Sequence, residues 1–271
     1  MSIKLLAIDI DDTLLTSSHE VHSTAPEMIS RALEAGVKVV LCTGRATPSA
    51  MSYAEELALK DAGQFLITYN GAVTTNLADD TIFADATLDL DDIRTLFDVS
   101  EEMGTHAHAI ADGGIFTPNN PLSPYTVREA WLTDLPLFYQ PVDELDESLI
   151  YNKFMMVDEP DILDRAQAHM KEHYSNQFTA LRSQPYYLEM IHPQASKGKA
   201  VAYLAEQLGI NLSETMGIGD SGNDLDLITT CGIGVAVGNA IDELKDLADY
   251  IAPTNDDGGV AHAIEKFILK S

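Results

Sequence analysis

Three oxygen-bearing side chains follow the first apolar run of the chain at alternate positions: Asp9, Asp11 and Thr13. Residues 4–10 predict a buried strand, so this cluster stands at the carboxyl end of the strand. Two carboxylates two residues apart can share one hard cation through their oxygens while one of them faces a substrate. An acidic turn or a helix cap is the alternative. A calcium-binding EF-hand loop is excluded, because Asp12 stands one place early and a strand rather than a helix precedes it.

A second cluster lies in the run from Gly217 to Asp224, again directly after a predicted strand. Asp220, Asn223 and Asp224 crowd three oxygen-bearing side chains into five positions. Crowded like charges are costly unless a cation neutralises them, and glycines let the backbone approach an ion closely. A polar loop that caps the next helix is the alternative, but a cap needs only one such residue. The pattern therefore favours a metal site.

Two further segments offer groups that suit a phosphate. Lys197 stands at the start of a predicted helix, where the positive end of the helix dipole disfavours a lysine unless an anion is bound. An ordinary solvated surface lysine is the alternative there. Thr43 and Gly44 offer a hydroxyl and backbone NH groups at another predicted helix entrance, which is a common phosphate environment.

The charge of the chain restricts its partners. The formal net charge is −27, from 43 acidic and 16 basic residues. A surface this anionic excludes electrostatic capture of nucleic acid or of an anionic membrane. A phosphate substrate therefore requires local positive charge, which a metal ion and a few lysines or arginines can supply.

Other features of the composition indicate a cytoplasmic protein. Apolar residues make up 45% of the 271, yet no run of them approaches the ~20 residues that a membrane span requires. Residues 1–15 lack the pattern of an export signal. Cys42 and Cys231 are far apart and neither belongs to a CxxC pair, so we expect buried free thiols in a reducing compartment.

Strands and helices alternate at both ends of the chain, which predicts an α/β fold with a Rossmann-like parallel sheet. Ligands bind beyond the carboxyl ends of the strands in such sheets, where Asp9 and Thr43 stand. The expected strands are 4–10, 37–42, 65–68, 215–218 and 233–237. The expected helices are a segment capped by Thr24 and stopped by Gly36, then 48–59, 199–208, 225–228, 241–247 and 260–269.

The texture changes between residues 85 and 193, which predicts a separate α+β unit inserted into the first domain. Residues 1–84 and 194–271 then form the core domain, and 85–193 form the inserted one. Within the insertion we expect helices over 89–104 and 161–174, and strands over 106–110, 114–117, 154–157, 178–183 and 187–191. Pro118, Pro121, Pro124 and Pro136 interrupt the stretch between them.

Four short motifs occur in order at the predicted strand and helix ends: Asp-x-Asp-x-Thr at 9–13, Thr-Gly-Arg at 43–45, Lys-Gly at 197–198 and Gly-Asp-x-x-Asn-Asp at 219–224. This ordered set resembles the haloacid dehalogenase superfamily of phosphatases. The similarity extends to residues 70–72, 235–240 and 257–261, and it is greatest to the Cof-type subfamily and its bacterial sugar-phosphate phosphatases. The resemblance implies that the insertion is a cap of the C2 type, which closes over the site and selects the leaving group.

The resemblance also implies the roles of the acidic residues. Asp9 would be the nucleophile that forms an aspartyl-phosphate, and Asp11 the acid that protonates the leaving oxygen and then the base that activates water. Mg²⁺ would be held by Asp9, Asp220 and the backbone carbonyl of Asp11, while Asp224 positions the loop without touching the metal. Asp12 stands where the family usually has glycine, and aspartate is among the few residues that tolerate a left-handed backbone.

The remaining roles concern the substrate, a small phosphate ester. By the resemblance, its phosphoryl oxygens would contact the backbone NH of Ile10 together with Thr43, Gly44, Lys197 and Asn223. Candidates for contact with the leaving group are Arg45, Tyr186, Tyr187 and Glu189, for which ordinary packing and surface charge are the alternative. Neither the sugar nor the oligomeric state follows from the resemblance.

Three other functions are alternatives to phosphate ester hydrolysis. A phosphomutase of the same superfamily would use Asp9 and Asp11 to transfer the phosphoryl group to a second sugar hydroxyl. A dinucleotide-binding oxidoreductase is suggested by Gly232, Gly234 and Gly238, but their spacing is not GxGxxG. A non-catalytic phosphate-binding module would leave the pair of aspartates unexplained.

Overall fold

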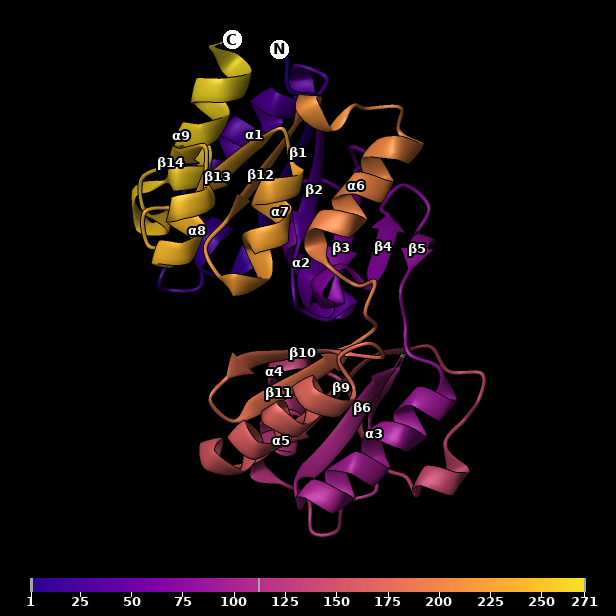
Figure 1. Cartoon of the computed structure of the whole chain (residues 1–271). Coiled ribbons are helices and arrows are strands. Elements are labelled where there is room, and N and C mark those ends of the chain that lie inside the picture. The colour runs from indigo at the N-terminus through magenta and orange to yellow at the C-terminus, as the bar shows by residue number, and fades with distance from the viewer. Residues whose placement is uncertain (1, 112, 271) are drawn as a thin grey trace. The chain divides into compact units, whose positions relative to one another are not determined.

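The computed structural model describes residues 2–111 and 113–270. It divides the chain into two compact units, which Figure 1 shows in ribbon form. The core unit joins the segment that ends at Asp85 to the segment that begins at Ser196, and the inserted unit spans Ala86–Ala195. The insertion therefore starts one residue later and ends two residues later than the range 85–193 expected from the sequence.

The core unit is built on one eight-stranded sheet, in the order β14-β13-β12-β1-β2-β3-β4-β5. Six strands are parallel: β1 (Leu5–Asp9), β2 (Lys38–Cys42), β3 (Phe65–Thr68), β12 (Thr215–Gly219), β13 (Ile233–Ala236) and β14 (Tyr250–Ile251). This arrangement confirms the predicted α/β class. The sequence did not predict the two strands at one edge of this mostly parallel sheet, β4 (Val73–Asn76) and β5 (Thr81–Asp85), which are antiparallel.

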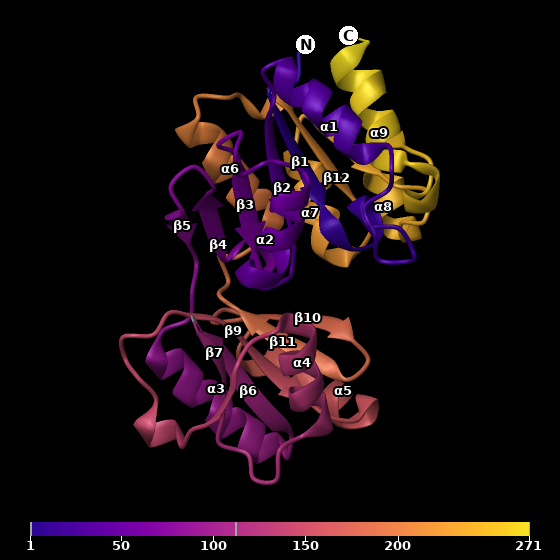
Figure 2. The same ribbon diagram turned by 180° about the vertical axis from the view of Figure 1, so that it is seen from behind.

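Helices cover both faces of this sheet, and β1 shows why its sequence is a continuous apolar run. All five residues of β1 are buried. Leu6 and Ile8 pack with α1 (Ala25–Glu34), α2 (Thr47–Glu56) and α9 (Gly259–Ile264), whereas Leu5 and Ala7 pack with α6 (Lys197–Gln207). Successive side chains of a strand point to opposite faces, so a strand buried on both faces is apolar along its length, and β1 departs from this only at its last residue, Asp9. Figures 1 and 2 show the two helical layers from opposite sides.

The remaining helices of the core lie close to their expected positions: α7 (Leu225–Thr230), α8 (Asp242–Leu247) and a π-helical turn over Glu265–Leu269 that continues α9. One cap was assigned wrongly from the sequence. Thr24 occupies the position before α1, but its side chain makes no capping hydrogen bond. Its hydroxyl instead lies 2.8 Å from Nδ1 of His22.

The inserted unit is a six-stranded sheet in the order β10-β11-β9-β6-β7-β8. Its strands are β6 (His106–Ala111), β7 (Gly114–Thr117), β8 (Leu137–Tyr139), β9 (Tyr151–Val157), β10 (Thr179–Gln184) and β11 (Tyr187–Ile191). Helices α3 (Leu90–Met103) and α5 (Pro160–His173) pack on one face through residues such as Leu96 and Leu163. Helix α3 begins at the predicted cap, because the Asp89 side chain accepts a hydrogen bond from the backbone NH of Asp92.

The proline-rich stretch of the insertion contains a helix that the sequence did not predict, α4 (Pro124–Thr133). Proline is tolerated at the first position of a helix, where its missing NH would have no partner in any case. Ser123 caps α4 by accepting a hydrogen bond from the backbone NH of Tyr125. Strand β8 was also missed.

Two predictions made from composition can be compared with the structure. Cys42 and Cys231 are buried free thiols, as predicted, and burial raises the pKa of both. Among the described residues, the helices are too short or too polar for any of them to cross a bilayer.

Candidate active site

The carboxyl ends of four neighbouring strands bring the sequence motifs together. Strands β12, β1, β2 and β3 are adjacent and parallel, so their ends lie along one edge of the core sheet. Asp9 is the last residue of β1, and Thr43 follows β2 directly. Asn70 lies in the turn after β3, and Asp220 follows β12. This edge is the place where a parallel sheet binds ligands.

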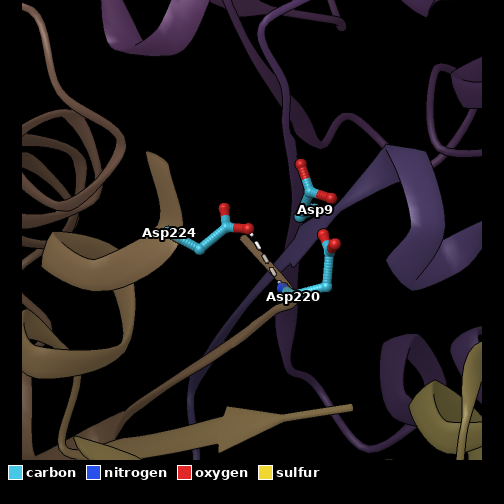
Figure 3. Close-up of side chains that lie close together, drawn as sticks. All are labelled: Asp9, Asp220 and Asp224. Atoms are coloured by element: carbon cyan, nitrogen blue, oxygen red, sulfur yellow. Dashed lines mark hydrogen bonds between the residues drawn. The ribbon is translucent and has the colours of Figure 1, made fainter. Parts of the chain in front are cut away.

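Three carboxylates meet at this edge: those of Asp9, Asp220 and Asp224. One oxygen of each lies within 4.8 Å of the others. Figure 3 shows the three groups turned toward one another from two strand ends and the loop after β12. Carboxylate oxygens are the ligands that Mg²⁺ prefers, so the donor set fits this ion.

The electrostatics of these carboxylates also fit a bound cation. Burial raises the pKa of Asp9, the charge of Asp224 raises it further, and Lys197 opposes both effects. Burial and the charge of Asp224 also raise the pKa of Asp220, to about 7. Like charges held together in a poorly solvated place retain protons unless a cation neutralises them. A divalent ion would therefore offset the free-energy cost of ionising these buried carboxylates.

Asp224 holds the loop that carries Asp220. Its Oδ2 accepts hydrogen bonds from the backbone NH groups of Asp220 and Ser221, both at 3.1 Å. A Cβ at Gly219 would lie 2.5 Å from the Cβ of Asp224, so only glycine leaves room for this arrangement. Asp224 also belongs to the carboxylate cluster, so it lies closer to the candidate metal position than the sequence suggested.

Lys197, the first residue of α6, is buried between two of the carboxylates. Its Nζ lies 2.5 Å from Oδ1 of Asp9 and 2.6 Å from Oδ1 of Asp224. Burial alone disfavours the ammonium, but the charges of Asp224 and Asp9 outweigh that effect and raise the pKa of Lys197. The alternative of a solvated surface lysine is therefore wrong. The permanent charge of Lys197 stands directly beside Asp9.

Asp11 lies close by but faces a different partner. Both of its oxygens accept hydrogen bonds from Arg45, and the Asp11 side chain is 46% exposed. Arg45 also donates to the hydroxyl of Ser49 and lies over the ring of Tyr53. Asp12 has φ 56°, which agrees with the predicted tolerance of aspartate for a left-handed backbone.

Apart from Lys197, the groups predicted to contact phosphate follow the strands whose carboxyl ends share the sheet edge with Asp9. Ile10 begins the turn Ile10–Leu14 directly after β1. Thr43 is fully buried, and its hydroxyl accepts a hydrogen bond from the backbone NH of Arg45 at 3.0 Å. Gly44 lies against the side chain of Asn70. Asn223 donates from Nδ2 to Oδ1 of the same Asn70.

The other three specificity candidates belong to the inserted unit. Tyr186 is half-buried and stacks on Tyr125, with ring centroids 4.9 Å apart. Tyr187 and Glu189 are buried on β11. The carboxylate of Glu189 lies 3.4 Å from the ammonium of Lys153, so a charge pair is buried inside this unit.

Sequence reasoning gave no role to three residues that orient the site. The hydroxyl of Thr13 donates to Oδ1 of Asp220 at 3.2 Å. Ser221 and Asn70 both hydrogen-bond to the amide of Asn223. Thr13 and Asn70 belong to motifs that the sequence analysis noted, and this was the only signal that could have identified them.

Comparison with known proteins places this geometry in a family. A family model described as haloacid dehalogenase-like hydrolase matches residues 6–264. The chain is 39% identical over 98% of both chains to the Bacillus subtilis protein named "Putative phosphatase YxeH". It is 29% identical to the "5-amino-6-(5-phospho-D-ribitylamino)uracil phosphatase YcsE" of the same organism, over 99% of this chain and 97% of the relative.

A solved structure from the same family has the same fold. The crystal structure of a haloacid dehalogenase-like hydrolase from Bacteroides thetaiotaomicron superposes with a TM-score of 0.87. The match covers 98% of this chain and 99% of the other, at 30% sequence identity.

Proposed function

Because the chain belongs to the haloacid dehalogenase-like hydrolases, we propose that it is a magnesium-dependent phosphatase that hydrolyses small phosphate esters, sugar phosphates above all, through an aspartyl-phosphate on Asp9. One observation carries the proposal. Asp9 is buried at a strand end with the ammonium of Lys197 at 2.5 Å and two further carboxylates within 4.8 Å. A nucleophile beside an ammonium and a carboxylate cluster that can hold a divalent cation suits phosphoryl transfer, because this reaction depends mostly on positioning and charge stabilisation.

In the first step, an oxygen of Asp9 attacks phosphorus, and the bond from phosphorus to the leaving oxygen breaks. For this step Asp11 must be protonated, with one oxygen turned from Arg45 to the leaving oxygen. Asp11 then gives its proton to that oxygen, so the alcohol leaves neutral. In the second step, Asp11 takes a proton from water while the water oxygen attacks the aspartyl-phosphate. The bond between phosphorus and Asp9 then breaks, which releases inorganic phosphate and leaves Asp9 as a carboxylate and Asp11 protonated, as each began.

The metal and phosphate contacts follow from the same assignment. Asp9, Asp220 and the backbone carbonyl of Asp11 would hold Mg²⁺. Asp224 would position the loop that carries Asp220. When bound, the ion neutralises charge on the carboxylates and the phosphoryl oxygens. The phosphoryl oxygens would contact the backbone NH of Ile10, the groups of Thr43 and Gly44, Lys197 and Asn223.

Selection of the leaving group is proposed for the inserted unit, which contributes none of these contacts. Tyr186, Tyr187 and Glu189 are its candidates, and Arg45 is the candidate in the core. The name of the relative YcsE supports our proposal that this chain prefers sugar phosphates, because it specifies the phosphate ester of a ribityl chain. The ribityl chain is a polyhydroxylated alcohol, as sugars are.

The test is a screen of purified protein against a panel of phosphate esters, with and without Mg²⁺. We expect stoichiometric release of inorganic phosphate that depends on the ion. Asp9→Asn should remove nearly all turnover, because an amide is a poor nucleophile. The matched control is Asp12→Asn, which makes the same change at an exposed position whose left-handed backbone asparagine tolerates.

Two results would contradict the proposal. Substantial phosphate release by Asp9→Asn would remove Asp9 from the nucleophile role. Conversion of a sugar phosphate into an isomeric sugar phosphate, without free phosphate, would identify a phosphomutase instead.

A further inference from the structure

The turn formed by Asn70 and Gly71 belongs to a motif for which the reaction supplies no role. Both residues have a left-handed backbone, with φ 56° at Asn70 and φ 97° at Gly71. Asparagine and glycine tolerate this conformation better than other residues do. Asn70 is nevertheless only 6% exposed, although it is polar and lies in a turn. A buried polar side chain needs partners, so the contacts of Asn70 show what the turn does.

The turn touches two of the segments that would bind phosphate. The backbone NH of Asn70 donates to the carbonyl of Thr43 at 2.9 Å. A Cβ at Gly44 would lie 3.0 Å from Oδ1 of Asn70, so this side chain packs directly on the Gly44 backbone. On the other side, a Cβ at Gly71 would lie 2.2 Å from the carbonyl oxygen of Ser196, the residue before Lys197.

The turn contacts a third segment that would bind phosphate, the loop after β12, through the amide of Asn223. Nδ2 of Asn223 donates to Oδ1 of Asn70 at 2.9 Å, and the hydroxyl of Ser221 donates to Oδ1 of Asn223 at 2.7 Å. A side-chain amide has two NH donors and one carbonyl acceptor. With one NH given to Asn70 and the carbonyl used by Ser221, the second NH is the donor that a phosphoryl oxygen would use.

We propose that Asn70 and Ser221 are positioning residues that clamp the amide of Asn223 with one NH directed to the phosphoryl group. The inference rests on the proposed function and deepens it. Neither residue touches the phosphate. Asn223 is only half-buried and lies in the loop Gly222–Asp224, so without the clamp its side chain would lose rotamer freedom each time phosphate binds. With the clamp, that entropy cost is met during folding.

The test measures inorganic phosphate binding by isothermal titration calorimetry at saturating Mg²⁺. Asn70→Gly removes the side chain and keeps a backbone that tolerates positive φ. We expect roughly tenfold weaker binding, the effect of about one hydrogen bond to a charged group. For phosphate esters, KM should rise more than kcat falls, because the clamp serves binding in the ground state and the transition state alike. Asn76→Gly, at the last residue of β4, is the matched control and should leave phosphate affinity unchanged.

A double-mutant cycle separates the clamp from a general structural role. In an Asn223→Ala background, Asn70→Gly should weaken phosphate binding no further, because the group that it positions is absent. Ser221→Ala removes the hydrogen bond to the carbonyl oxygen of the same amide. It should also weaken phosphate binding, and it should cause no further loss in the Asn223→Ala background. It keeps the inference testable if Asn70→Gly does not fold.

The outcomes that would overturn the inference are distinct from failure of the proposed function. Phosphate affinity unchanged by Asn70→Gly or by Ser221→Ala would overturn the clamp, and so would additive losses in the Asn223→Ala background. If the wild-type chain neither bound phosphate nor released it from esters, the proposed function itself would be wrong.

Discussion

Arg45 holds the carboxylate of Asp11 through two hydrogen bonds, from Nε to Oδ2 at 2.8 Å and from Nη2 to Oδ1 at 2.6 Å. Two parallel bonds of this kind fix the orientation of a carboxylate as well as its distance. Arg45 is itself held by Ser49 and by the ring of Tyr53. The candidate acid therefore has a defined position although its side chain is 46% exposed. This relationship gives Arg45 an effect on catalysis that needs no contact with the leaving group.

Arg45→Ala should slow esters with poor leaving groups more than esters with good ones. An alkyl leaving oxygen needs a proton from Asp11, whereas the nitrophenolate of p-nitrophenyl phosphate does not. General acid catalysis contributes about 10²-fold or more, so kcat/KM for a sugar phosphate should fall by roughly that factor and for the aryl ester by much less. Arg45→Lys should be intermediate. Equal losses for both esters would show that Arg45 does not act through Asp11.

Mg²⁺ should stabilise the protein more at pH 8 than at pH 6. The pKa of Asp220 is raised from 3.8 to about 7, so the cation-free fold binds a proton there that the unfolded chain releases at lower pH. The stability due to this proton is lost as pH rises toward about 7. Below that pH the proton competes with the ion. The measurement is the shift in Tm between EDTA and Mg²⁺ at each pH.

Asp220→Asn should remove most of the Tm shift caused by Mg²⁺ at pH 8, while Asp12→Asn should retain it. Equal shifts at pH 6 and pH 8 in the wild-type protein would contradict the assignment of Asp220 as a metal ligand.

Lys197→Met should destabilise the cation-free protein. The substitution leaves the carboxylates of Asp9 and Asp224 buried without the ammonium that now contacts both. Breaking a buried ion pair by removing one partner costs about 3–5 kcal/mol. Urea unfolding at pH 8 in EDTA should show this loss, and added Mg²⁺ should recover part of it. Lys199→Met, at an exposed position two residues later, is the control, and an equal loss there would refute the explanation.

The sequence predicted best what depends on neighbouring residues. Strands β3 (Phe65–Thr68), β7 (Gly114–Thr117) and β11 (Tyr187–Ile191) begin and end as expected, because each is a short run of strand-favouring residues between turn signals. Helix α4 was missed because its first residue is a proline, which local reasoning treated as a break. The antiparallel edge of the core sheet was missed because polar residues such as Thr74 and Thr75 give β4 no apolar run.

The site was predictable in outline for a related reason. Parallel strands put their carboxyl ends along one edge, so Asp9, Thr43 and Asp220 could be brought together without coordinates. The hydrogen-bond and ion-pair partners of individual side chains could not be predicted in this way. Nothing local indicates that Arg45 pairs with Asp11, 34 positions away, or that Lys197 is buried against Asp9, 188 positions away. These contacts depend on how distant elements pack.

His108 should make the stability of the inserted unit sensitive to acid. It is fully buried, with Nδ1 3.1 Å from the hydroxyl of Thr126. Burial and the charge of Lys153 lower its pKa from 6.5 to about 3. Stability is then complete above about pH 6.5 and is lost as pH falls toward 3, because the unfolded chain takes up the proton first. Unfolding free energies between pH 7 and pH 4 should fall less steeply for His108→Gln than for wild type. Parallel curves would show that His108 does not contribute.

Substitutions in the inserted unit should change which ester is preferred, whereas substitutions around Asp9 should slow all esters. Every proposed phosphate and metal contact belongs to the core unit, and we propose that the inserted unit acts on the leaving group. Tyr186→Ala should alter the ratios of kcat/KM among sugar phosphates and leave acetyl phosphate nearly unaffected, since its leaving group offers little to recognise. Tyr139→Ala, at an exposed position on β8, is the control.

Lys197→Met supplies the contrasting result, because each of these substrates presents the same phosphoryl group to Lys197. Its kcat/KM should fall by a similar factor for every sugar phosphate and for acetyl phosphate. Glu189→Gln should also lower the stability of the inserted unit, because Glu189 is buried beside Lys153 and the substitution weakens this charge pair. Its effect on specificity is therefore measured as a ratio between substrates, which a loss of folded protein leaves unchanged. Uniform losses from Tyr186→Ala, together with selective losses from Lys197→Met, would show that leaving-group recognition belongs to the core.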